Sequence, residues 1–313
     1  MMNKKVLTIA GSDSSGGAGI QADLKVMCAY GVYGMSVITA VTAQNTLGVQ
    51  QVEELPPEVV AAQLSSVLED IRPDAVKIGM VYSRENVEVI GEAVERWGLE
   101  NVVLDPVMVS SSGRELLRPD AAEAMQEILF PKVTLVTPNV PEAGKLAGFL
   151  KDSLAKEEVQ DCRKPIKLLG GIEKGQDRDA GCQEQVTEIS GKERGGGSVF
   201  WTESIARIFS ERWHTAFLIK GGHRKDAPAD YLYDGEKGVW FPGRRVETRH
   251  THGTGCTLSS AVACNLAKGY SLEESVREAK IYLTGCLENS PGIGHGHGAL
   301  NHLWKMEIEN GKR

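Results

Sequence analysis

The chain has 313 residues, of which 41% are hydrophobic and 25% are charged, a composition typical of a soluble globular α/β protein. The formal net charge of −7 excludes a general attraction to nucleic acid or to anionic membranes. No apolar run is long enough to span a bilayer, and the six cysteines include no Cys-x-x-Cys pair. We therefore expect a cytoplasmic protein with reduced thiols that binds phosphate groups only at a local site.

Strand-like and helix-like segments alternate along most of the chain. The predicted strands are 6–10, 35–43, 75–80, 102–104, 133–136 and 216–219, and the predicted helices are 20–30, 57–70, 85–97, 121–129, 203–213, 258–267 and 272–288. This alternation predicts a mainly parallel sheet with helices on both faces. The stretch from Asp230 to Phe241 predicts a hairpin around Asp234-Gly235.

Residues 151–200 interrupt the alternation. The segment is charged, contains Gly170-Gly171 and Gly195-Gly196-Gly197, and has no sustained hydrophobic period. We predict a single domain, residues 1–313, with an insertion or mobile loop at 151–200.

The loop after the first strand is rich in glycine and serine. Its glycines do not form the Gly-x-Gly-x-x-Gly pattern of dinucleotide-binding proteins, and the polar Asp13 interrupts them. Loops at the carboxyl ends of strands usually hold the ligands of α/β proteins. We interpret the loop from Gly11 to Gly19 as a substrate contact, with a merely flexible loop as the alternative.

Polar side chains follow two further strands. Gln44 comes after the second strand, and its amide could pair with the amino group and ring nitrogen of a heteroaromatic ligand, or it could cap a turn. Asp105 follows the fourth strand directly and precedes a proline. A carboxylate there could meet a metal ion or a phosphate-bearing ligand, although Asp-Pro also begins ordinary turns.

The next two strand ends carry groups suited to a charged ligand. Asn139 and Glu142 lie three residues apart, so both could face a Mg²⁺ ion held largely through water, but the same spacing is close to a helix capping box. The local sequence favours the cap. Lys220 stands beside two glycines, where its charge could act on a transferring phosphoryl group.

A glycine turn opens the helix that begins near Gly253-Thr254-Gly255-Cys256. The backbone N–H groups at such a helix start, together with the helix dipole, form a site for anionic oxygens. A thiol at this end of a helix tends to have a lowered pKa, so Cys256 could serve as a base beside a bound phosphate. An ordinary turn with a buried cysteine is the alternative.

Taken in order, these motifs resemble those of the hydroxymethylpyrimidine/phosphomethylpyrimidine kinases of thiamin biosynthesis, in the ribokinase-like superfamily. The residues that carry the resemblance are 10–23, 42–46, 105–108, 137–143, 219–223 and 252–259, with a Gly-His-rich ending at 294–302. The resemblance covers nearly the whole chain except roughly 151–200. It implies a ribokinase-like three-layer sandwich with a mainly parallel central sheet.

The resemblance also implies an activity and a set of roles. The activity is the phosphorylation of 4-amino-5-hydroxymethyl-2-methylpyrimidine by ATP with Mg²⁺, and then of its monophosphate to the diphosphate, by an enzyme that is expected to be a homodimer. The implied roles are a base at Cys256, an anion hole at Gly253, Thr254 and Gly255, a pyrimidine pocket at Gln44, Gly11, Asp13 and Met80, and ATP phosphate contacts at Asn139, Glu142, Lys220 and Asp105, with Glu142 and Asn139 ordering Mg²⁺ indirectly.

Two other functions fit part of this pattern. A pyridoxal or pyridoxine kinase of B6 salvage would share the Gly-Thr-Gly-Cys element, whereas Gln44 favours an aminopyrimidine. A non-catalytic pyrimidine-binding sensor would have no need of Lys220 or Cys256. The chain departs from the family in its insertion, which borders the nucleotide side, and in having Ala299 after Gly298, where a proline is more usual.

Overall fold

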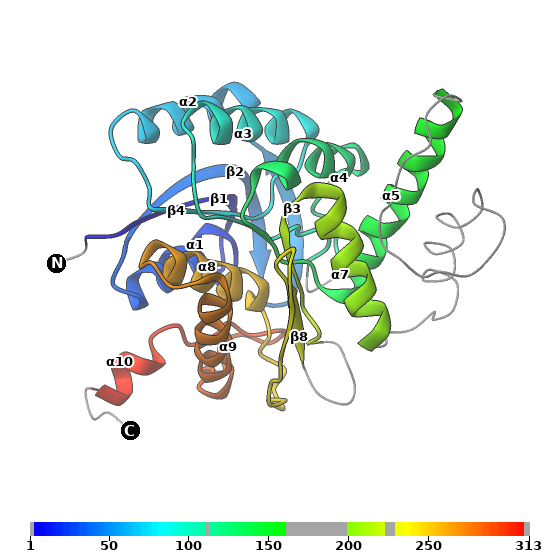
Figure 1. The fold of residues 1–313 in the computed structure, drawn as a ribbon. Coiled ribbons are helices and arrows are strands. Elements are labelled where there is room, and N and C mark those ends of the chain that lie inside the picture. The colour runs from blue at the N-terminus through cyan, green and yellow to red at the C-terminus, as the bar shows by residue number, and fades with distance from the viewer. Residues whose placement is uncertain (1–2, 111–112, 161–198, 223–228, 310–313) are drawn as a thin grey trace.

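The structure is a computed structural model, and it describes residues 3–110, 113–160, 199–222 and 229–309. Within these residues the strands form one nine-stranded sheet in the order β3-β2-β1-β4-β5-β6-β7-β8-β9 (Figure 1). The strands are β1 (Lys5–Asp13), β2 (Tyr33–Asn45), β3 (Gly48–Glu54), β4 (Ala75–Ile78), β5 (Val102–Leu104), β6 (Leu135–Val136), β7 (Ala216–Ile219), β8 (Asp230–Tyr233) and β9 (Gly238–Phe241). Strands β2, β1, β4, β5, β6 and β7 pair in parallel. The mainly parallel sheet predicted from the sequence is therefore confirmed.

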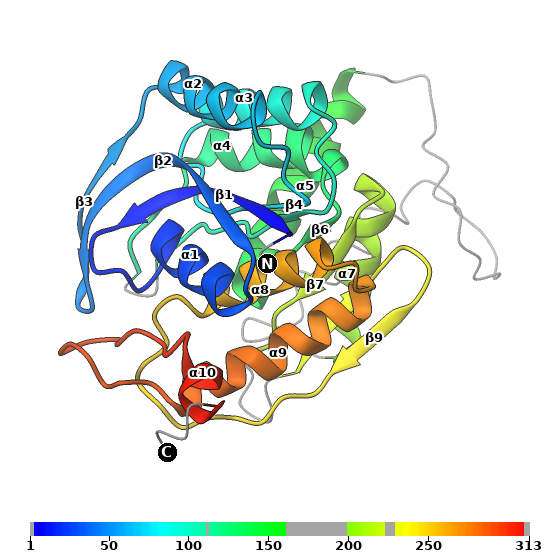
Figure 2. The same ribbon diagram turned by 90° about the vertical axis from the view of Figure 1, so that its left-hand side faces the viewer.

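Helices cover both faces of the sheet. One layer contains α2 (Pro57–Leu68), α3 (Arg84–Arg96), α4 (Pro119–Ala124), the π-helical turn η1 (Met125–Leu129), the 3-10 turn η2 (Phe130–Lys132), α5 (Val140–Gln160) and α7 (Val199–Trp213). The other contains α1 (Gly19–Ala29), α8 (Thr254–Ala267) and α9 (Leu272–Glu288), with the short α10 (Trp304–Glu309) near the C-terminus. Figure 2 shows the sheet between these layers, with α2 and α3 on one side and α1, α8 and α9 on the other.

Each face of the sheet has its own apolar core, which follows from the two-residue period of a strand. In β1, Leu7 and Ile9 pack into the cluster under α2, α3 and α7, whereas Val6 packs into the cluster under α1, α8 and α9. All three are fully buried. Burial on both faces explains why β1 reads as a continuous apolar run rather than an alternating one.

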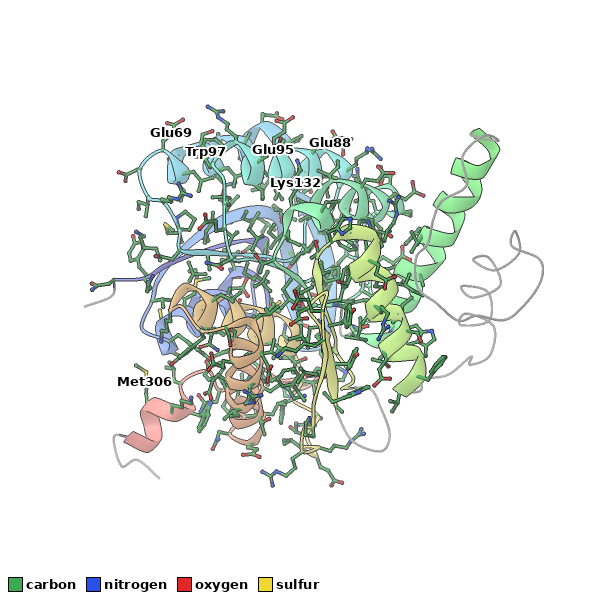
Figure 3. The ribbon with its side chains drawn as sticks, in the orientation of Figure 1. Glu69, Glu88, Glu95, Trp97, Lys132 and Met306 are labelled. Carbon is green, nitrogen blue, oxygen red and sulfur yellow. The ribbon has the colours of Figure 1, made fainter. Side chains whose placement is uncertain are left out.

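The outer surface of the α2–α3 layer is charged. Glu69, Glu88 and Glu95 lie on it exposed, as labelled in Figure 3. Lys132 Nζ lies 2.6 Å from Glu95 Oε2 at this surface. None of the helices in the described part of the chain is long and apolar enough to span a membrane.

The structure adds two features that the sequence analysis did not predict. Strand β3, which pairs antiparallel with β2, was not predicted, because its polar sequence Gly-Val-Gln-Gln-Val-Glu-Glu lacks a strong apolar pattern. Helix α5 runs to Gln160, into the segment where an insertion was predicted to begin at residue 151. Lysine, alanine and glutamate are good helix formers, so the charged composition there does not end the helix. Residues 161–198 of the predicted insertion lie outside the described part of the chain.

The hairpin predicted around Asp234-Gly235 is confirmed. Strands β8 and β9 pair antiparallel on either side of it, and Gly235 has a φ of 100°, in the region that favours glycine. The hairpin adds antiparallel strands to the edge of the sheet beyond β7, so β1 and β4–β7 remain in its centre.

Candidate active site

The residues selected from the sequence gather along one edge of the sheet. Because β1, β2 and β4–β7 are parallel, the segments that follow them meet at their common carboxyl edge. These positions are Gly11 and Asp13 in the last part of β1, Gln44 near the end of β2, Met80 after β4, Asp105 after β5, Asn139 and Glu142 after β6, Lys220 after β7, and Gly253, Thr254, Gly255 and Cys256 at the start of α8.

A small pocket opens at the β2 end of this edge. Its lining residues are Gln44, Asn45, Thr46, Gly48, Ser110, His252 and His297. A larger hollow, lined by Lys4, Asp74 and neighbouring residues, lies at the amino ends of β1 and β4, on the opposite edge. We assign the candidate ring-binding site to the smaller pocket because Gln44 lines it and because it lies at the same edge of the sheet as the other predicted residues.

A small apolar cluster around Met80, which we call the apolar wall, includes Val49, the neighbour of the pocket residue Gly48. Met80 packs with Ala40, Val49 and Leu116 in a small buried cluster. A Cβ atom placed on Gly11 would lie 3.0 Å from the Met80 sulfur, so the glycine allows a close approach of β1 to Met80. Met80 and Gly11, both predicted as pocket residues, therefore do contact each other.

Asp13 organises the glycine-rich loop. Its Oδ1 accepts hydrogen bonds from Ser15 N and Ser15 Oγ, both at 2.8 Å, and its Oδ2 accepts from Gly17 N at 3.0 Å and Ala18 N at 2.8 Å. Burial of Asp13 works to raise its pKa, but the hydrogen bonds from His252 and Ser15 outweigh it and lower the pKa to about 2. The Asp13 carboxylate therefore holds the glycine-rich loop and His252 together at this edge of the sheet.

His252 joins this loop to the pocket. Its Nε2 lies 2.8 Å from Asp13 Oδ2 and 3.2 Å from the Gln44 amide nitrogen. A Cβ atom on Gly17 would overlap the His252 ring, so a glycine is required there. His252 belongs to a motif recognised in the sequence, yet sequence reasoning gave it no role.

The turn before α8 also requires a glycine. Gly253 has a φ of 84°, and a Cβ atom on it would collide with the carbonyl oxygen of Gly17. Thr254 N donates a hydrogen bond to Thr251 O at 3.4 Å. The N–H groups of Gly255 and Cys256 lie in the first turn of α8, where backbone N–H groups have no acceptor within the helix. The predicted anion hole thus lies directly against the glycine-rich loop.

Lys220 and Asp105 form an ion pair beside this helix start. Lys220 Nζ lies 2.6 Å from Asp105 Oδ1, which also accepts a hydrogen bond from Thr137 Oγ1 at 3.1 Å. Burial works to lower the pKa of Lys220, but Asp105 and Glu142 raise it above its ordinary value. A Cβ atom on Gly255 would lie 3.0 Å from Asp105 Oδ2 and 3.5 Å from Lys220 Nζ. The first turn of α8 therefore faces a lysine that stays protonated.

Asn139 and Glu142 form the capping box that the local sequence favoured. Glu142 N donates to Asn139 Oδ1, and Asn139 N donates to Glu142 Oε2, both at 2.8 Å. Burial raises the pKa of Glu142 to about 7, with Lys220 opposing the shift and Asp105 adding to it. A cation bound beside this carboxyl would favour its ionised form.

The cysteine differs from its sequence expectation. Cys256 is half-buried, and burial raises the pKa of its thiol to about 11, although the nearby Lys77 ammonium works to lower it. The lowered pKa expected at a helix start is therefore wrong for this structure, because loss of solvation outweighs the favourable end of the helix. At neutral pH the thiol carries its proton.

A buried ionic network beneath Cys256 was missed from the sequence. Lys77 Nζ lies 2.8 Å from Asp23 Oδ2, and neither side chain is exposed. Thr8 Oγ1 donates to the same oxygen at 2.6 Å, and Ser260 Oγ donates to Asp23 Oδ1 at 2.7 Å. The available signal was a lysine inside the apolar strand 75–80, because an isolated buried charge requires a partner.

The Gly-His-rich segment near the C-terminus packs against the β2–β3 turn. Gly296 N donates to Thr46 Oγ1 at 3.2 Å, and His297 N donates to Thr46 O at 2.8 Å. His302 instead lies buried, with its Nε2 3.0 Å from Thr257 Oγ1. Among the described residues there is no cluster of three or more His, Cys, Asp or Glu side chains that could hold a metal ion.

Comparison with known proteins places the chain in one family. The model of the phosphomethylpyrimidine kinase family matches residues 13–174 and 198–301, and the unmatched residues 175–197 lie within the predicted insertion. A hydroxymethylpyrimidine/phosphomethylpyrimidine kinase of Rhizobium meliloti (strain 1021) is 43% identical over 310 residues, covering 97% of this chain and 100% of the relative.

Solved structures agree with this result. The phosphomethylpyrimidine kinase of Clostridium difficile 630 is similar with a TM-score of 0.67 and 37% identity, covering 90% of this chain and 98% of that one. The pyridoxal kinase of Staphylococcus aureus in complex with AMP-PCP and pyridoxal has a TM-score of 0.76 and 31% identity, covering 97% and 95%. These similarities confirm the ribokinase-like fold. The family model matches most of this chain, and the Rhizobium meliloti relative is 43% identical to it. The chain therefore belongs to the phosphomethylpyrimidine kinase family.

Proposed function

We propose that this protein uses ATP to phosphorylate the hydroxymethyl oxygen of 4-amino-5-hydroxymethyl-2-methylpyrimidine, and then converts the monophosphate to the diphosphate in thiamin biosynthesis. The observation that carries the proposal is the chain of contacts along one edge of the sheet. Gln44 contacts His252 at the pocket. Gly255, which follows His252 by three residues, lies against the Lys220–Asp105 ion pair. Ring recognition and phosphate stabilisation would thus occur side by side.

The pyrimidine would bind between Gln44 and the apolar wall at Met80. An amide offers a donor and an acceptor together, which suits an amino group beside a ring nitrogen. Met80 and the cluster around it supply an apolar surface for the ring.

The phosphates of ATP would lie at the start of α8. Backbone N–H groups there and the Lys220 ammonium would stabilise the negative charge of the transferring phosphoryl group. Because phosphoryl transfer leaves little covalent work to the protein, this positioning would supply most of the rate enhancement.

Mg²⁺ fits the oxygen-rich group formed by Asn139 and Glu142. Hard oxygen ligands suit this ion, and it usually keeps several of its waters. The single side-chain oxygen of Asn139 and one carboxylate oxygen of Glu142 already accept hydrogen bonds in the capping box, so the ion would be ordered largely through water. When bound with ATP, Mg²⁺ would neutralise phosphate charge.

Cys256 would accept the proton of the substrate hydroxyl. The thiol is protonated in the free protein, so the thiolate is a minor species at neutral pH. The thiol must therefore first release its own proton to solvent, and the resulting thiolate then accepts the hydroxyl proton during transfer. We further propose that the protein forms a homodimer, as the family resemblance implies, and that it works in the cytoplasm, as its sparse cysteines suggest.

The test is an ATP-consumption assay with product identification, offering the hydroxymethylpyrimidine, its monophosphate and pyridoxine separately. Turnover of the two pyrimidines with little turnover of pyridoxine is the expected result. Turnover of pyridoxine alone would move the function to B6 salvage, for which the likeness to a pyridoxal kinase is the supporting observation. Pyrimidine binding without any turnover would support a sensor instead.

A further inference from the structure

One ring nitrogen of His252 contacts two polar side chains at the pocket. Nε2 lies 2.8 Å from Asp13 Oδ2 and 3.2 Å from the amide nitrogen of Gln44. A ring nitrogen either carries one hydrogen and donates it, or has a lone pair and accepts. It cannot donate to Asp13 and accept from Gln44 at the same time.

The contacts of Asp13 show whether His252 Nε2 donates or accepts a hydrogen bond. Its Oδ2 already accepts hydrogen bonds from the backbone N–H groups of Gly17 and Ala18, so no proton occupies that oxygen. The low pKa of Asp13, about 2, agrees with a carboxylate that is ionised at neutral pH. His252 Nε2 must therefore carry the hydrogen that joins it to Asp13.

A protonated Nε2 leaves no acceptor for the amino group of Gln44. With the amide nitrogen toward His252, two donors would face each other. Turning the amide by 180° brings its carbonyl oxygen toward His252, where it shares the ring hydrogen with Asp13. The oxygen and nitrogen of an amide have nearly the same shape, so hydrogen bonding decides between these orientations.

Thr42 independently favours the turned amide. Its Oγ1 lies 3.0 Å from the Ser12 carbonyl oxygen and 3.1 Å from the other end of the Gln44 amide. If that end is an oxygen, one hydroxyl hydrogen must serve two acceptors. If it is the amino group, Thr42 donates to Ser12 and accepts from Gln44, and each contact has a donor and an acceptor.

We propose that His252, held by Asp13, is a positioning residue that fixes the Gln44 amide with its oxygen toward His252 and its amino group toward Thr42, and so selects the substrate ring. The ring selection rests on the proposed function. A fixed amide presents its acceptor and donor in one order. It matches an amino group beside a ring nitrogen and opposes the 4-oxo counterpart, which presents a carbonyl beside an N–H group.

The test compares two variants at position 252. Calorimetry would give the Kd of the aminopyrimidine and of its 4-oxo counterpart for the wild type, His252→Met and His252→Gln. We expect the preference for the amino ring to fall about tenfold in His252→Met, because its Gln44 amide then keeps only the contact with Thr42 and can turn more easily. We expect His252→Gln to keep the preference, because its amide nitrogen can replace the ring donor. An unchanged preference in His252→Met would overturn the proposal.

Nitrogen-15 NMR of the ligand-free wild type tests the orientation without any variant or ligand. The expected spectrum shows a protonated Nε2 in His252, and an unprotonated Nε2 would overturn the proposal. If Nε2 is protonated but the wild type binds neither ring, the proposed function fails while the proton assignment stands.

Discussion

Lys77 and Asp23 form a fully buried ion pair, with 2.8 Å between Lys77 Nζ and Asp23 Oδ2. The pair joins β4 to α1, and the hydrogen bonds from Thr8 and Ser260 extend it to β1 and α8. Ser260 lies one helical turn after Cys256. This network therefore fixes the helix start that forms the candidate phosphate site against the sheet.

Removing the lysine should strongly destabilise the protein. In Lys77→Met, the Asp23 carboxylate would stay buried without its counter-ion, and we expect the free energy of unfolding to fall by about 3–5 kcal/mol. Urea denaturation followed by circular dichroism measures the change. The matched control is Lys4→Met, because Lys4 pairs with Asp74 at the surface, with 45% and 26% of the side chains exposed. That variant should lose less than about 1 kcal/mol, and equal losses would contradict the argument.

Replacing the proposed base should reduce turnover rather than binding. We expect Cys256→Ala to lower kcat on the order of 10²- to 10⁴-fold, the range usual for general acid–base catalysis, with nearly unchanged pyrimidine binding. Steady-state kinetics and calorimetry would separate the two effects. Cys28→Ala is the control, because that thiol lies exposed in α1, away from the site. Full activity in Cys256→Ala would exclude the base role.

The raised pKa of Cys256 predicts a pH dependence for its reactivity. Since the thiolate is the reactive form and the pKa is about 11, the alkylation rate should be low at pH 7. It should then rise about tenfold per pH unit up to pH 10, because the thiolate fraction grows in that proportion below the pKa. Iodoacetamide labelling with mass spectrometry of the Cys256 peptide measures this. A rate that levels off near pH 7 would mean that the helix start, not burial, controls the thiol.

Adding a methyl group at Gly255 should disturb phosphate binding. The new Cβ would lie 3.0 Å from Asp105 Oδ2 and 3.5 Å from Lys220 Nζ, in space that a phosphate would need. We expect Gly255→Ala to lower kcat/KM for ATP on the order of 10²-fold, as small displacements at reacting groups do. Gly144→Ala is the control, because a Cβ there meets nothing within 4 Å. A similar loss in both variants would point to a general effect on folding.

Local sequence patterns predicted most of the fold. The apolar segments 102–104 and 216–219 coincide with β5 and β7, and the Asp234-Gly235 signal marked its hairpin correctly. These elements follow from burial and turn chemistry that act within a few residues. Strand β3 was missed because an edge strand is stabilised by pairing with β2 rather than by its own apolar pattern.

The sequence by itself determined which polar groups stand at the carboxyl ends of the strands, since side-chain type, strand period and glycine turns are local properties. Gln44, Lys220 and the turn at Gly253 were all identified in this way. The tertiary structure decided their partners and their protonation. Contacts between distant segments join Asp13 to His252 and Asp23 to Lys77, and burial in the assembled fold raises the pKa of Cys256. Solvation and charge pairing depend on neighbours far away in the chain, so no local pattern could reveal them.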